Sequence, residues 1–166
     1  LGARVLTDTV PQALALIAQE LRPQVIHQSG SAQIDALRAN YQRAGVEAEL
    51  VPFIDDMASA FANADLVVCR AGASTVTEIA ALGVAALFVP LPSAVDDHQS
   101  RNARFLVDQG GGWLLPQAEL SADRLAQFFQ QATRESLLAC AATARRCAKT
   151  DATAQVVRAC AELVVS

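Results

Sequence analysis

A chain of 166 residues is long enough to form one domain with a buried core. Hydrophobic residues make up 52% of it and charged residues 18%, a composition that excludes an intrinsically disordered protein. The net charge is −4 and aromatic residues are only 5%, so the chain offers neither a basic surface nor an aromatic stacking platform, and we expect no nucleic-acid partner.

The four cysteines lie at Cys69, Cys140, Cys147 and Cys160, and none forms a C-x-x-C pair. Because the chain has only two histidines, a zinc site is not expected either. The cysteine spacing does not suggest a disulfide framework, which makes a reducing cytoplasm the expected compartment. No signal peptide and no apolar run of about 18 residues occurs, so we expect no membrane-spanning segment.

Strands and helices are predicted to alternate along most of the chain. Short apolar runs bounded by turn residues predict strands over 24–28, 47–51, 66–69, 85–89 and 113–115. Apolar residues at helical spacing predict helices over 11–21, 34–44, 56–63, 98–109, 124–131 and 134–148, and further helices that begin at 74 and 151. This order predicts a single α/β domain over 1–166, a Rossmann-like doubly wound parallel sheet with a helical tail over 121–166.

The rest of the chain is organised around the segment 65–81. Its run Leu66–Cys69 is too short for a helix and is typical of a buried parallel strand. In the turn that follows, only Gly72 tolerates a positive φ without strain. The next helix is predicted to bury Val76, Ile79, Ala80 and Leu82. A strand, a glycine turn and a helix N-terminus in this order can hold an anion or a sugar.

Glu78 has two interpretations. The spacing Thr75-x-x-Glu78 fits a capping box, in which the carboxylate accepts a hydrogen bond from a backbone N–H at the helix start. Alternatively, the two carboxylate oxygens suit the two hydroxyls of a ribose. The local pattern alone favours the capping box and leaves the ribose interpretation open.

Polar residues follow four of the predicted strands, at the edge where doubly wound sheets bind ligands. These residues lie in the segments 27–30, 53–57, 70–78 and 96–102. No G-x-G-x-x-G fingerprint and no phosphate-binding P-loop occurs, so we expect no dinucleotide cofactor.

Most of these polar residues also have structural interpretations. His27 is typical of a structural histidine, and Asp56 is placed to cap the helix that follows it. Asp96 or Asp97 can cap the helix that opens with His98 and Gln99, and those two residues can alternatively bond sugar hydroxyls. Ile54, as a turn residue, can offer its backbone N–H and C=O to a flat base.

The motifs at these positions resemble the C-terminal half of the MurG family of glycosyltransferases. Members of this family transfer N-acetylglucosamine (GlcNAc) from UDP-GlcNAc to lipid I, a lipid-linked muramyl-pentapeptide, and so form lipid II in peptidoglycan synthesis. The matching segments are LGARVL from residue 1, HQSG from 27, FIDDM from 53, ADLVVCRAGASTVTEIAALG from 64, ALFVPLP from 86 and DDHQSRNA from 96. They run in the family's order and cover most of the chain.

The resemblance implies a GT-B architecture, in which two Rossmann-like domains face each other and this chain is the UDP-GlcNAc-binding one. Ile54 would then meet the uracil through its backbone, and Glu78 would bind the ribose hydroxyls, a role that can alternate with the capping box between the bound and the empty state. The remaining implied donor contacts are Ser74 and Thr75 at the diphosphate, His98 and Gln99 at the GlcNAc, and Arg70 and Gly72 at the pocket floor.

Two parts of the family's pattern are not found in the chain: the G-G-S phosphate loop with its strand, and the acceptor domain. We therefore expect a fragment with no catalytic residue of its own, since inverting transfer needs a general base for the acceptor hydroxyl. Lipid I and the cytoplasmic face of the inner membrane would be contacted through the acceptor domain. Two alternatives stay open: another UDP-sugar transferase of the same architecture, and a non-catalytic subunit of a split transferase.

Overall fold

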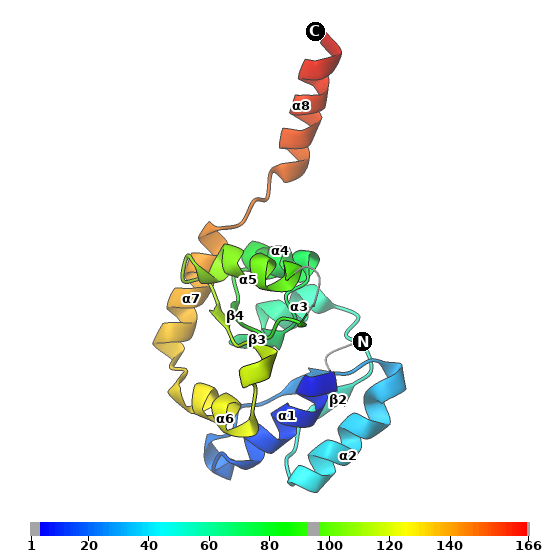
Figure 1. The fold of residues 1–166 in the computed structure, drawn as a ribbon, viewed down its shortest axis with the longest axis vertical. Helices are drawn as coiled ribbons and strands as arrows, with labels where there is room; N and C mark the ends of the chain where they lie inside the picture. The colour runs from blue at the N-terminus through cyan, green and yellow to red at the C-terminus, as the bar shows by residue number, and fades with distance from the viewer. Residues whose placement is uncertain (1–3, 93–96, 166) are drawn as a thin grey trace.

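The computed structural model describes residues 4–92 and 97–165 (Figure 1). Asp96, one of the two predicted caps, lies outside the described residues. The described strands are β1 (Ile26–Gln28), β2 (Glu49–Val51), β3 (Leu66–Cys69), β4 (Ala85–Phe88) and β5 (Trp113–Leu114). The described α-helices are α1 (Arg4–Ala15), α2 (Ile34–Ala44), α3 (Met57–Ala62), α4 (Ala73–Leu82), α5 (His98–Val107), α6 (Ala122–Gln131), α7 (Arg134–Arg146) and α8 (Ala152–Val165).

All strand pairs are parallel, as the alternation of strands and helices predicts. The strands form two separate sheets rather than the one predicted sheet, with the orders β1-β2 and β3-β4-β5. A doubly wound fold has the strand order 3-2-1-4-5-6. The pair β2-β1 corresponds to positions 3 and 2 of this order, and the sheet β3-β4-β5 corresponds to positions 4, 5 and 6.

Strand β4 lies between the two hydrophobic clusters of the core and contributes residues to both. All four of its residues are buried, and the residues from Ala86 to Val89 alternate between two hydrophobic clusters. Leu87 and Val89 belong to a cluster with residues of α1, α2 and α6, whereas Ala86 and Phe88 belong to one with residues of α4, α5 and α7. Helices therefore cover both faces of this sheet (Figure 1), which confirms the doubly wound arrangement.

The first helix differs from its prediction. It begins at Arg4, and Pro11, expected near its first turn, lies in its interior. A proline there removes the hydrogen bond to the carbonyl four residues earlier. That carbonyl belongs to Thr7, and it accepts a bond of 3.1 Å from Asn40 Nδ2 on α2. Because α2 supplies the missing donor, the helix continues through the proline.

Several local signals are confirmed. Helix α2 spans the predicted residues and ends at Gly45, whose φ of 63° is left-handed. Asp56 caps α3, accepting a bond of 2.9 Å from the Ser59 N–H. Two burial predictions are wrong: the residues of β3 are only half-buried, because β3 is an edge strand, and Leu82 at the end of α4 is 40% exposed.

The C-terminal helix α8 projects away from the rest of the molecule (Figure 1). Its apolar residues Val156, Val157 and Leu163 are exposed. In the described part of the chain, no helix combines the length and the apolar character that crossing a membrane requires.

Candidate functional site

The structure brings the predicted site residues together in two groups. One group lies at the carboxyl ends of β1 and β2: His27 and Gln28 are the last two residues of β1, and Ile54 follows β2. The other lies after β3 and β4 and contains Arg70, the start of α4 and the start of α5. In each sheet these residues follow the carboxyl ends of parallel strands, which is where doubly wound folds bind ligands.

The start of α5 is fastened to the turn after β3. Gln99 Oε1 accepts hydrogen bonds from Ala71 N at 3.3 Å and from Leu91 N at 2.9 Å. Asn102 Nδ2 donates to Ala71 O at 3.1 Å, so both backbone polar groups of the buried Ala71 are bonded by α5. Among the described residues Gln99 Nε2 has no partner, and it is the atom of Gln99 that a ligand can use. His98, the first residue of α5, is exposed.

The Arg70 side chain, which follows β3, bonds the backbone after β4 and the side chain of Gln117, which follows β5. Its Nη1 donates to Val89 O at 2.9 Å and Pro90 O at 3.1 Å, and its Nη2 donates to Gln117 Oε1 at 2.7 Å. Burial lowers the pKa of Arg70, and its Nε is buried without a partner in the described part of the chain. Gln117 lies 47 residues from Arg70, and no sequence pattern points to this bond.

The N-terminus of α4 differs from its prediction in two ways. Gly72 has a φ of −62°, which any residue adopts, so the turn does not use the tolerance of glycine for a positive φ. The helix begins at Ala73 with Gly72 as its N-cap, because Gly72 O already accepts from Val76 N at 3.0 Å. Thr75 therefore stands at the third helical position and Glu78 a turn further on, which rules out the capping box.

This helix start is open to a ligand. In the described part of the chain, no side chain caps it, so its first N–H groups have no side-chain partner there. A Cβ on Gly72 would meet only Thr75 Oγ1, at an ordinary distance of 3.6 Å, so neither backbone conformation nor packing requires glycine there. Ser74 and Glu78 are exposed, and Glu78 has no hydrogen-bond or ion-pair partner among the described residues. The arrangement can accept an anion at the N–H groups and a hydroxyl pair at the carboxylate.

In the other group, His27 is a structural histidine, as predicted. Its Nδ1 lies 3.0 Å from the Tyr41 hydroxyl, and the two rings meet edge to face. Burial lowers the pKa of His27 to about 4.

The same group contains a bond between Gln28 and Ile54. Gln28 Oε1 accepts a hydrogen bond of 3.2 Å from Ile54 N, so the N–H that Ile54 is expected to offer to a base already has a partner. Gln28 belongs to the polar segment 27–30 that the sequence predicts at this edge, but no role of its own is predicted for it.

The His27 environment predicts a loss of stability in mild acid. The unfolded chain takes up a proton on His27 below its ordinary pKa of about 6.5, whereas the folded chain does so only below about 4. The free energy of unfolding should therefore fall by about 1–2 kcal/mol between pH 7 and pH 5 through this group. Urea denaturation of the wild type and of His27→Gln at both pH values measures it, and an equal fall in both would contradict the assignment.

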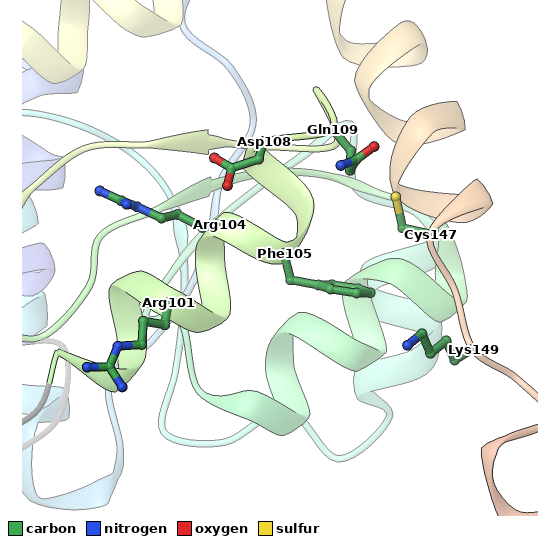
Figure 2. A pocket seen from close by; sticks show the side chains of 7 residues that line it. All are labelled: Arg101, Arg104, Phe105, Asp108, Gln109, Cys147 and Lys149. Carbon is green, nitrogen blue, oxygen red and sulfur yellow. The ribbon is translucent and has the colours of Figure 1, made fainter.

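A groove lies elsewhere on the surface. It has a volume of about 490 Å³ and lies between α5 and the segment after α7 (Figure 2). Figure 2 shows Phe105 pointing toward Lys149, whose Nζ lies 5.9 Å from the ring centroid, while Arg101 and Arg104 point away from them. None of the predicted site residues lines this groove, and it is open to solvent.

A parallel α/β fold with an uncapped helix N-terminus beyond the carboxyl end of a strand is the architecture of a nucleotide-binding domain. The model of the family "Glycosyltransferase family 28 C-terminal domain" matches residues 1–158. The chain belongs to this family.

Curated relatives agree with the family. Proteins from Polaromonas sp. and Paracidovorax citrulli are 66% and 67% identical to the chain over 163 residues. Both are named UDP-N-acetylglucosamine--N-acetylmuramyl-(pentapeptide) pyrophosphoryl-undecaprenol N-acetylglucosamine transferase. The matches cover 98% of this chain but only 42% and 46% of those proteins, so the chain spans less than half their length.

Solved structures confirm the fold class. The crystal structure of Acinetobacter baumannii MurG is similar with a TM-score of 0.87 at 44% identity, over 95% of this chain and 48% of that one. The glycosyltransferase VinC, solved in complex with DTDP, has a TM-score of 0.65 at 22% identity over 95% of this chain and 39% of its own, and shows the fold alone.

Proposed function

We propose that this chain is the UDP-GlcNAc-binding half of the glycosyltransferase that adds GlcNAc to lipid I to form lipid II in peptidoglycan synthesis. The relatives' names and their identity over nearly the whole chain support the activity. The observation that carries the role of this half is the N-terminus of α4, which no side chain of the described residues caps, with Gly72 in front of it and the Glu78 carboxylate, without a partner among those residues, one turn along.

Each part of the donor has a matching group, and the uracil would meet the backbone of Ile54. The diphosphate would accept bonds from the N–H groups at Ser74 and Thr75, where the helix dipole favours negative charge. Glu78 would accept from the ribose hydroxyls. His98 and the Nε2 atom of Gln99 would contact the GlcNAc. Arg70 and Gly72 would form the floor, Arg70 by holding the two strand ends together and Gly72 by leaving room.

The chemistry of the transfer assigns the remaining tasks to another part of the enzyme. The acceptor hydroxyl attacks the sugar carbon, its proton goes to a general base, and UDP leaves with the bonding electron pair. We assign no base to a residue of this chain and expect no transfer by the chain alone. Lipid I, and a peripheral contact with the cytoplasmic face of the inner membrane, would involve the acceptor domain.

Titration with UDP-GlcNAc, UDP-GalNAc and UDP tests the proposal. The two sugars differ only in the configuration of one hydroxyl, so a site with directed hydrogen bonds should discriminate between them. Calorimetry should show saturable binding that is tightest for UDP-GlcNAc. Equal affinity for the three ligands would contradict the sugar contacts of α5, tighter binding of UDP-GalNAc would favour a different UDP-sugar transferase, and no binding would contradict a donor site in this chain.

A further inference from the structure

The backbone N–H of Ile54 is occupied by a side chain of the same molecule. Gln28, the last residue of β1, accepts this N–H through Oε1 at 3.2 Å, and both residues are half-buried. The loops that carry the two residues are joined independently of this bond: Ser29 N donates to Val51 O at 3.3 Å and Gly30 N to Pro52 O at 3.0 Å. The Gln28 side chain is therefore not needed to hold the loops together.

The carboxamide of Gln28 resembles the edge of the base that Ile54 is proposed to bind. A primary amide presents a carbonyl oxygen beside an N–H, and the imide edge of uracil presents the same pair. Both would use the Ile54 N–H as donor, and a single N–H cannot make a full-strength bond to two acceptors at once. The amide and the base are thus alternatives for one site.

We propose that Gln28 is an internal competitor for the uracil site: it keeps the Ile54 N–H bonded while the site is empty and is displaced when the base of the donor enters. This inference rests on the proposed donor function. Its physical basis is that a half-buried N–H without a partner is destabilising, so an empty base site is more stable with a built-in substitute. Only molecules in which Gln28 is not bonded to Ile54 can bind the base, so the apparent affinity for the base is the intrinsic affinity multiplied by the fraction of such molecules.

Variants of Gln28 should change base affinity in opposite directions. The probe is uridine, which carries no phosphate, so charge repulsion with the diphosphate does not enter. Gln28→Ala removes the competitor and should bind uridine about 2- to 10-fold tighter, the factor that corresponds to one net hydrogen bond. Gln28→Glu supplies a charged, stronger acceptor and should bind about 5- to 10-fold more weakly. Gln24→Ala, an exposed glutamine ahead of β1, is the control and should bind as the wild type does.

NMR titration of the 166-residue chain gives the affinity and the state of the Ile54 amide together. In the absence of uridine, Ile54 N–H should exchange with solvent faster in Gln28→Ala than in the wild type, and saturating uridine should protect it in both. Equal or weaker binding by Gln28→Ala would overturn the inference and assign Gln28 a supporting role. If uridine binds without perturbing Ile54, or if none of the proteins binds uridine at millimolar concentration while the wild type binds UDP-GlcNAc, the inference fails and the proposed function stands. If the wild type binds neither ligand, both fail.

Discussion

Glu78→Gln is expected to weaken UDP binding by about 1–3 kcal/mol, a factor of roughly 5 to 150, while the free energy of unfolding hardly changes. Glu78 is exposed and has no partner among the described residues, so neutralising it removes no contact of the described fold. The glutamine keeps the length of the side chain but replaces one acceptor oxygen by a donor, which cannot accept the second ribose hydroxyl.

The control for this experiment is Glu47→Gln. Glu47 is also exposed but precedes β2, at the amino end of that strand, away from the edge where the site residues lie. Both variants change the net charge of the chain by the same amount, so a general electrostatic effect on a charged ligand would appear in both. Calorimetry with UDP and thermal melting should find reduced affinity in Glu78→Gln alone. A lower melting temperature with unchanged affinity would instead give Glu78 a structural role.

Signals that act within a few residues were sufficient to predict several elements. The left-handed Gly45 ends α2 and the Asp56 cap starts α3, and both effects are complete within one helical turn. The start of α4 shows the limit of such signals. Thr75 and Glu78 have the spacing of a capping box, but the chain enters the helix at Gly72, so the same spacing falls inside the helix.

Contacts between distant segments could not be predicted from local patterns. The proline in α1 is tolerated because Asn40, 33 residues from Thr7, bonds the carbonyl that Pro11 leaves free. The site follows the same rule. The sequence predicts the site residues at the strand ends. The bond between Gln28 and Ile54, however, joins residues 26 apart, and only the folded arrangement shows that the Ile54 N–H is already bonded to Gln28. Prediction of a residue's location was thus more successful than prediction of its partner.

Arg70→Ala is expected to lower the free energy of unfolding by about 2–4 kcal/mol and to weaken UDP-GlcNAc binding as a consequence. The substitution removes the donor that the carbonyl oxygens of Val89 and Pro90 share, and the donor to Gln117. Buried acceptors that lose their donors are destabilising, and Arg70→Lys should recover only part of the loss because one ammonium group cannot reproduce the planar fork of the guanidinium.

Arg134→Ala provides the matched control, since Arg134 is exposed and its one ion pair among the described residues is distant, with Nη1 3.8 Å from Asp65 Oδ1. Such a pair contributes less than about 1 kcal/mol, so this variant should unfold almost as the wild type does in urea. If Arg70→Ala also unfolded like the wild type but failed to bind the donor, Arg70 would act on the ligand directly and not through the strand ends. A joint loss of stability and affinity, with partial recovery in Arg70→Lys, would instead show that the donor site depends on the bonds that hold β3, β4 and the segment after β5 together.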